Sequence, residues 1–318
     1  MIAIDSAHEL LRAGRPADAL AELVSAANAG DAPSALELGI WFLEGKFVQR
    51  DLHRSRAAFG RAAELGETAA ERVFTSFLAI GVGAAPDWEG ALQRLRQFAA
   101  RDALAAEQLE LLERMDLTQS GDPLESAFGQ QLSVEPEIYC FERLFSSDEC
   151  AFLISAAQPL LQPSVVVEPS TGELRPHPIR TSEGAMFPWA SEDLVVHALN
   201  RRLAAASATP VACGEPLQVL RYGPGQEYRP HIDALPQGEN QRIFTMLVYL
   251  NDDYQGGETL FNRTGLAFRG DIGTALLFRN SLPDGSPDRK AQHAGLPVVR
   301  GEKFIASRWI REQPLMAR

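Results

Sequence analysis

The spacing of hydrophobic positions divides the chain into two parts. Over residues 1–115 Ala and Leu dominate, and apolar residues recur every three or four positions, as in amphipathic helices. From residue 135 onward they come in short runs broken by Gly, Pro and Asn, a pattern typical of many short strands. Residues 116–134 hold turn formers and few bulky apolar side chains. The pattern predicts an α+β multidomain chain: a helical domain over 1–115, a linker over 116–134 and a strand-rich domain over 135–318.

The helical part repeats itself with a period of 36 residues. Small and large residues alternate at equivalent positions, which lets one helix pack closely on the next, and glycine is expected to end helices at the turns. About three helical hairpins are predicted. The aligned positions are the small residues Ala19, Ser55 and Ala91, the larger residues Leu23, Phe59 and Leu95, and the glycines Gly45 and Gly81.

The strand-rich part also contains two predicted helices. Residues 146–149 place Ser before two acidic residues, which is typical of a helix N-terminus, and an apolar stretch follows. Residues 193–206 have helical spacing as well. The short apolar runs between and after them favour an all-β barrel or sandwich.

Composition and charge mainly exclude certain classes of binding partner. The chain is 45% hydrophobic and 23% charged, which is ordinary for a soluble protein. Residues 1–120 carry 12 basic and 18 acidic residues and the remainder carries 18 and 24, so each part has a net charge of −6. Because neither part is basic, nucleic acid and anionic membranes are not expected as partners.

The cysteines and the apolar stretches bear on the cellular compartment. The three cysteines lack C-x-x-C spacing, which argues against both a disulfide framework and a structural zinc site. The first residues lack the basic and apolar regions of a signal peptide, and no uncharged stretch reaches the roughly 18 apolar residues that a membrane span needs. A cytoplasmic protein is therefore expected.

Candidate chemistry is concentrated in the stretch from Gln218 to Asp233. Side chains at positions i and i+2 of a strand point to the same face, so His231 and Asp233 can offer an imidazole nitrogen and a carboxylate oxygen to one ion. A third ligand from His293, on a distant strand, would complete a two-His-one-carboxylate triad. Such a triad holds non-haem Fe(II) and leaves coordination positions open.

Five ordered motifs surround these residues. With them, residues 135–314 resemble the prolyl 4-hydroxylase branch of the 2-oxoglutarate/Fe(II) dioxygenases. The motifs are Tyr222-x-x-Gly225-x-x-Tyr228-x-x-His231-x-Asp233, Arg242-x-x-Thr245-x-x-x-Tyr249-Leu250-Asn251, Gly256-Gly257-Glu258-Thr259, His293-x-Gly295-x-Pro297-Val298, and Gly301-x-Lys303 with Trp309.

The resemblance implies a fold, a reaction and a set of site residues. The fold is a double-stranded β-helix, a jelly-roll barrel with flanking helices. The cofactors are Fe(II) and 2-oxoglutarate as co-substrate, with ascorbate as a further candidate. By motif position, the catalytic iron ligands are His231, Asp233 and His293, the co-substrate residues are Lys303, Tyr222 and Thr259, and the substrate residues are Tyr228, Arg242 and Trp309.

Alternatives stay open for several of these residues. Tyr222 and Thr259 are of types that often only pack in strands, and Arg242 can instead pair with an acid on the surface of the barrel. Arg311 stands where some peptide-acting relatives have His, which leaves the identity of the substrate open.

The helical part has its own resemblance, to the Sel-one-like repeats of the tetratricopeptide-like superfamily. The motifs are Ala35-Leu36-x-Leu38-Gly39-x-x-Phe42-x-x-Gly45 and Ala57-Ala58-Phe59-x-x-Ala62-Ala63-x-x-Gly66. Such repeats form surfaces that bind a protein or peptide, although a packing or dimerisation role is equally compatible.

Together, the resemblances predict an oxidoreductase. Its expected reaction is hydroxylation of a prolyl or other residue in a protein or peptide, coupled to decarboxylation of 2-oxoglutarate to succinate. One alternative is the same chemistry on a free amino acid or small metabolite. The other is a non-catalytic interaction module.

Overall fold

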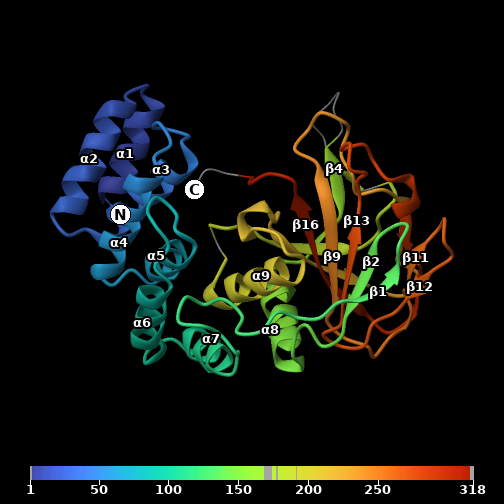
Figure 1. Ribbon diagram of the computed structural model, residues 1–318. Helices are drawn as coiled ribbons and strands as arrows, with labels where there is room; N and C mark the ends of the chain where they lie inside the picture. The colour runs from blue at the N-terminus through green and yellow to red at the C-terminus, as the bar shows by residue number, and fades with distance from the viewer. Residues whose placement is uncertain (1, 168–173, 177, 191, 316–318) are drawn as a thin grey trace. The chain divides into compact units, whose positions relative to one another are not determined.

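The computed structural model describes residues 2–167, 174–176, 178–190 and 192–315 (Figure 1). The chain forms two compact units. The first contains residues 1–122 together with 189–197, and the second contains residues 123–188 and 198–317. Nothing in the sequence predicts that residues 189–197 pack with the first unit.

The first unit is built from helices that pack on their neighbours in chain order. They are α1 (Ile2–Arg12), α2 (Pro16–Asn28), α3 (Ala32–Glu44), α4 (Leu52–Glu64), α5 (Thr68–Ile80), α6 (Trp88–Ala99) and α7 (Ala103–Glu113).

The predicted repeat of 36 residues is visible in the helix ends. Helices α3 and α5 both end at a glycine in the left-handed region, Gly45 with φ 69° and Gly81 with φ 82°. Helices α4 and α6 both begin after an aspartate, Asp51 and Asp87, whose side chain accepts a hydrogen bond from the first turn. Each pair is 36 positions apart, so equivalent residues start and end equivalent helices.

The repeat also explains how these helices pack. The small residues Ala19, Ser55 and Ala91 are all 0% exposed. At Gly39 a Cβ atom would lie 2.7 Å from the Phe59 ring, so glycine there lets α3 approach α4. The alternation of small and large residues therefore produces close helix contacts, as the sequence predicts.

The second unit is rich in strands, and its described residues include α8 and most of α9, the two helices that the sequence predicts. Its elements are β1 (Gln130–Ser133), β2 (Ile138–Phe141), α8 (Ser147–Ala157), β3 (Gln162–Pro163), β4 (Val165–Val167), β5 (Leu174–Pro176), β6 (Glu183–Phe187), α9 (Leu194–Ala206), β7 (Leu217–Tyr222), β8 (Tyr228–His231), β9 (Arg242–Tyr249), β10 (Gln255–Gly256), β11 (Thr259–Phe261), β12 (Ala267–Phe268), β13 (Ala275–Arg279), β14 (His293–Gly295), β15 (Val298–Arg300) and β16 (Lys303–Arg311).

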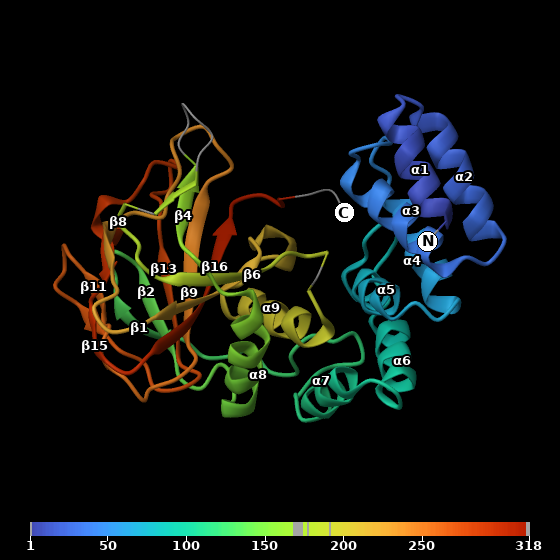
Figure 2. The ribbon, with the colours of Figure 1, turned by 180° about the vertical axis from the view of Figure 1, so that it is seen from behind.

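Most of these strands belong to two antiparallel sheets. The large sheet has the order β1-β2-β13-β9-β16-β7-β6-β3, and the small sheet has the order β12-β11-β14-β8. Figure 1 labels β1, β2, β9, β13 and β16 of the large sheet and β11 and β12 of the small one, and Figure 2 also labels β6 and β8. Apolar side chains from both sheets share one core, for example Phe261 from the small sheet with Leu220 and Phe278 from the large one. The site described below lies between these two sheets.

The arrangement confirms the predicted α+β jelly roll, in which two sheets pack against each other. In the part of the chain that the structure describes, the strands do not close into a barrel. Side-chain packing in the shared core joins the two sheets, and the hydrogen-bond ladder is not continuous from one sheet to the other. The fold is therefore an open, two-sheet α+β arrangement.

The helices of this unit start where the sequence predicts. Helix α8 begins with a capping box, in which Ser146 and Glu149 each bond to the other's backbone N–H. It packs on β6 and β7. No helix among the described residues is long and apolar enough to cross a lipid bilayer.

Candidate active site

The pairing of two short strands brings three candidate ligands together. His231 is the last residue of β8 and Asp233 follows two residues later, while His293 opens β14. Strands β8 and β14 are antiparallel neighbours in which His293 lies directly opposite His231. Residues about sixty positions apart in the chain therefore sit side by side on one sheet.

The three side chains converge on a common point. One atom from each of His231, Asp233 and His293 lies within 4.8 Å of the other two. The Nε2 atom of His231 is 3.5 Å from Oδ1 of Asp233, and Nε2 of His293 is 3.7 Å from Oδ2. Two imidazole nitrogens and one carboxylate oxygen in this arrangement fit a divalent cation such as Fe(II).

Hydrogen bonds on the far side of each ring fix which nitrogen faces the cluster. Nδ1 of His231 is 2.8 Å from the carbonyl oxygen of Arg229, and Nδ1 of His293 is 3.0 Å from that of Ala291. Because a carbonyl oxygen only accepts, Nδ1 carries the hydrogen in both rings. In the neutral form of each ring, Nε2 then has its lone pair toward Asp233.

The electrostatics favour the protonation states that a metal site needs. Burial, together with the nearby His293, lowers the pKa of His231 to about 4. Burial opposes ionisation of Asp233, but His293, His231 and the hydrogen bond from Thr245 outweigh it and keep the pKa of this carboxyl below its ordinary value. At neutral pH the cluster therefore presents a neutral His231 ring beside a carboxylate.

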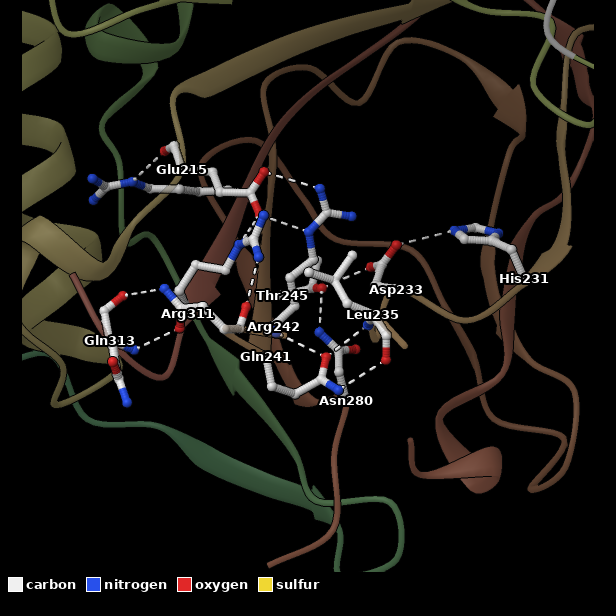
Figure 3. A network of polar contacts seen from close by, with 12 residues as sticks. Glu215, His231, Asp233, Leu235, Gln241, Arg242, Thr245, Asn280, Arg311 and Gln313 are labelled. Carbon is white, nitrogen blue, oxygen red and sulfur yellow. Dashed lines mark hydrogen bonds and ion pairs between the residues drawn. The ribbon is translucent and has the colours of Figure 1, made fainter. Parts of the chain in front are cut away.

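Two polar residues that the sequence analysis gave no role support the carboxylate (Figure 3). Thr245 donates a 2.7 Å hydrogen bond to Oδ2 of Asp233, and Asn280 donates a 2.8 Å hydrogen bond to Thr245. The position of Thr245 within a motif was a signal that it matters. Asn280 lies outside the motifs, and only the pairing of β13 with β9 brings it here.

The co-substrate candidates lie in the same pocket as the three ligands. Lys303 is 3% exposed, and its ammonium donates a 2.7 Å hydrogen bond to the carbonyl oxygen of Gly257. No carboxylate among the described residues forms an ion pair with Lys303, and burial lowers its pKa to about 7 despite Glu258 nearby. A buried cation without a paired anion suits the distal carboxylate of an acidic ligand. The pocket is lined by Arg180, Leu220, Tyr222, Tyr228, His231, Asp233, Leu247, Thr259, His293, Gly295, Leu296, Lys303, Ile305, Ser307 and Trp309.

Tyr222 and Thr259 are buried beside this lysine. The Lys303 ammonium lies 5.8 Å from the centre of the Tyr222 ring and 5.1 Å from that of Tyr249. The hydroxyl of Thr259 is 2.8 Å from that of Tyr249. Tyr249 belongs to a motif but was given no role by the sequence; its hydroxyl contacts that of Thr259, which lines the pocket.

The three candidate substrate residues occupy different places. The ring of Tyr228 stacks on His231 with centroids 3.5 Å apart. Trp309 lines the pocket, and the guanidinium of Arg242 lies over its ring at 3.7 Å. Arg242 also makes a bidentate ion pair with Glu215, at 2.6 and 2.9 Å. The sequence left two roles open for Arg242, contact with substrate or pairing with an acid. The structure contains the pairing with an acid.

Glu215 is shared by a second arginine and was missed by the sequence analysis (Figure 3). Nε of Arg311 also bonds to Glu215, and its Nη1 donates to the carbonyl oxygen of Asn240 at 2.6 Å. One carboxylate therefore holds two guanidinium groups at the edge of the pocket. No motif includes Glu215, so only the folded structure reveals it.

Gln241 fastens the loop that follows Asp233. Its side-chain oxygen accepts from the backbone N–H of Leu235 at 2.6 Å, and its nitrogen donates to the carbonyl oxygens of Leu235 and Gly285 at 2.9 and 3.1 Å. Figure 3 shows the hydrogen bonds between this side chain and Leu235. Gln241 thereby joins the loop that carries Asp233 to the loop of Gly285, which precedes His293 in the chain.

Comparisons with known proteins agree with this geometry. The sequence pattern of the 2OG-Fe(II) oxygenase superfamily matches residues 217–311. Prolyl 4-hydroxylase 1 of Arabidopsis thaliana is 35% identical over 201 residues, which cover 57% of this chain and 71% of that protein.

Two solved structures are also similar. The viral collagen prolyl hydroxylase of Paramecium Bursaria Chlorella virus-1, solved as a 2OG complex, is 30% identical with a TM-score of 0.44, covering 55% of this chain and 94% of that one. A Sel1 repeat protein from Oxalobacter formigenes is 24% identical with a TM-score of 0.30, covering 34% of this chain and 85% of that one.

Proposed function

The chain belongs to the prolyl 4-hydroxylase family of 2OG-Fe(II) oxygenases, and on this premise we propose that it hydroxylates a prolyl residue in a protein or peptide. As a member of the family it is a 2-oxoglutarate/Fe(II)-dependent dioxygenase. The observation that carries the proposal is the convergence of His231, Asp233 and His293 in one pocket with the buried ammonium of Lys303.

In this proposal the protein supplies binding and orientation. His231, Asp233 and His293 hold iron, and Lys303 neutralises the distal carboxylate of 2-oxoglutarate, with Tyr222 and Thr259 beside it. When bound, iron and 2-oxoglutarate supply the oxidising chemistry, in which O2 converts 2-oxoglutarate to succinate and CO2 and one oxygen atom enters a C–H bond of the substrate.

The residues at the edge of the pocket position the substrate. Tyr228, stacked on His231, shields one side of the cluster from water. Trp309 offers an apolar surface, and Arg242 is held over that ring by its ion pair with Glu215. A rigid wall of this kind orients one C–H bond of the substrate at low entropic cost.

The division of labour along the chain is part of the proposal. We assign catalysis to residues 135–318, and we assign recruitment of the polypeptide substrate to the helical repeats of residues 1–115. Repeat helices with their own core, as here, commonly present binding surfaces. A reducing compartment such as the cytoplasm suits the three cysteines, which are all buried and free.

Mass spectrometry tests the proposed reaction directly. The full-length protein is incubated with Fe(II), 2-oxoglutarate, ascorbate and a set of proline-containing peptides, with free proline in parallel. We expect peptide-dependent succinate release and a gain of one oxygen atom on proline. His231→Ala should abolish both, whereas His53→Ala, which changes an exposed residue of the helical unit, should not.

Other outcomes would decide between the alternatives. Turnover with free amino acids but no peptide would favour a small-molecule hydroxylase. A wild-type protein that binds no divalent metal would leave only a non-catalytic interaction module. For recruitment by the repeats, deletion of residues 1–115 should abolish succinate release that depends on a long substrate but not release that depends on a short peptide.

A further inference from the structure

A chain of two hydrogen bonds leads away from the candidate metal site into the core (Figure 3). Nδ2 of Asn280 donates to Oγ1 of Thr245 at 2.8 Å, and the Thr245 hydroxyl donates to Oδ2 of Asp233 at 2.7 Å. Asn280 is 0% exposed and Thr245 is 1% exposed. Because solvent does not reach the two residues, water cannot readily replace either hydrogen bond.

The direction of the chain follows from which groups can donate. A carboxylate only accepts, an amide NH2 only donates, and a hydroxyl has a single hydrogen. With Asn280 donating to its oxygen, Thr245 has its hydrogen left for Asp233. If Asn280 presented its oxygen instead, two acceptors would compete for that one hydrogen. Asn280 therefore decides that the Thr245 hydroxyl points toward the carboxylate.

The backbone holds these two residues in place independently of the site. Thr245 lies in β9 opposite Phe278 of β13, and Asn280 directly follows β13. The backbone N–H of Asn280 donates to the carbonyl oxygen of Ile243 at 2.9 Å. Both side chains thus come from adjacent paired strands, and rigid elements of this kind position a site precisely.

We propose that Thr245 and Asn280 are positioning residues for the metal: Asn280 orients the Thr245 hydroxyl, and Thr245 holds the Asp233 carboxylate in the rotamer that meets both imidazoles. This rests on the proposed role of His231, Asp233 and His293 as metal ligands. Partners that hydrogen bond to metal ligands typically change metal affinity about 10- to 100-fold when they are removed.

Metal affinity of the full-length protein tests the proposal. The dissociation constant for Mn(II) or Co(II) is measured without 2-oxoglutarate or substrate, so the result does not depend on which substrate the enzyme uses. Thr245→Val keeps the side-chain shape but lacks the hydroxyl, and we expect it to weaken metal binding roughly 10- to 100-fold. Thr245→Ser should bind nearly as tightly as wild type.

A matched control removes a buried hydroxyl elsewhere in the same unit. Ser207 is 7% exposed and its hydroxyl donates to the carbonyl oxygen of Leu203. Ser207→Ala should lower the melting temperature without changing the metal dissociation constant. A purely structural effect of Thr245→Val would resemble this control.

Asn280 is tested through its dependence on Thr245. Asn280→Leu should weaken metal binding less than Thr245→Val does, because the hydroxyl remains. In a Thr245→Val background, Asn280→Leu should have no further effect on the affinity, since its role passes through the missing hydroxyl. If Thr245→Val does not fold, the metal affinities of Asn280→Leu and Thr245→Ser still test the prediction. Asn280→Leu should bind metal more weakly than wild type, and Thr245→Ser nearly as tightly as wild type.

Several results would overturn the inference. One is a Thr245→Val protein that folds and binds metal as tightly as wild type. Another is an Asn280→Leu substitution that lowers metal affinity equally in the wild-type and the Thr245→Val backgrounds. A third is an Asn280→Leu single variant whose metal affinity is unchanged. A wild-type protein that binds no divalent metal would overturn the ligand assignment itself, which separates failure of the proposed function from failure of this inference.

Discussion

The ammonium of Lys303 donates a 2.7 Å hydrogen bond to the carbonyl oxygen of Gly257, inside the pocket that also contains the His–Asp–His cluster. This neutral oxygen accepts the hydrogen bond, and Lys303 forms no ion pair with a carboxylate of the described residues. A buried charge held in this way is costly until an anion pairs with it. This arrangement supports the proposal that Lys303 pairs with a carboxylate of the co-substrate.

Replacing this lysine separates ligand binding from stability. Lys303→Met should strongly weaken 2-oxoglutarate binding because the pairing cation is lost. The ligand-free variant should be as stable as wild type or more so, since the buried ammonium is removed. Calorimetry and thermal unfolding with and without 2-oxoglutarate measure both effects.

An exposed lysine provides the control. Lys290 pairs with Glu135 at the surface, where the side chains are 56% and 70% exposed. Lys290→Met should change neither the 2-oxoglutarate affinity nor, measurably, the free energy of unfolding. Unchanged 2-oxoglutarate affinity in Lys303→Met would contradict the role of Lys303.

The same lysine should make the stability of the ligand-free protein depend on pH. Burial lowers the Lys303 pKa from 10.5 to about 7. Between these two values the unfolded chain binds a proton that the folded chain does not, so the contribution of Lys303 makes stability rise as pH rises from about 7 to about 10. Urea unfolding across this range should show a steeper rise for wild type than for Lys303→Met. Identical slopes would show that the pKa of Lys303 is not depressed.

The low pKa of His231 predicts how protons compete with the metal. The imidazole must be neutral to bind a metal, and burial lowers the His231 pKa to about 4. The His231 contribution should therefore leave Mn(II) affinity little changed between pH 8 and 6 and lower it steeply only as the pH approaches 4. An NMR titration of the His231 ring in the metal-free protein checks this directly, and a midpoint at the ordinary value of 6.5 would contradict it.

Glu215 is predicted to stabilise the edge of the pocket. It pairs with Arg242 and Arg311, and its side chain is 12% exposed. Glu215→Gln would leave two guanidinium groups facing each other, and we expect a loss of about 3 kcal/mol in the free energy of unfolding. Because Arg242 would no longer be held over Trp309, the KM for peptide should also rise.

The matched control for Glu215 is an acid in an exposed pair. Glu302 lies 3.4 Å from Arg221, with side chains 52% and 34% exposed. Glu302→Gln should cost less than about 1 kcal/mol and leave the KM unchanged. Equal effects of the two substitutions on stability would show that the Glu215 cluster is no stronger than a surface ion pair.

The sequence by itself determined the periodic and the motif-bearing features. The repeat of 36 residues predicted helices that end at Gly45 and Gly81, because helix termination there depends on a local backbone conformation. The i, i+2 spacing of His231 and Asp233 and the order of the motifs predicted a metal site with a nearby cation. The helix ends are confirmed, because they depend on residue types at short spacing, and the structure brings the three proposed ligands and Lys303 into one pocket.

Only the tertiary structure decided which other residues support the site. Glu215 and Asn280 lie outside every motif, and they reach Arg242 and Thr245 because distant segments meet in the fold. The sequence also could not decide whether the sheets close into a barrel. Strand order and side-chain contacts across a core depend on long-range packing, which no local spacing in the chain encodes.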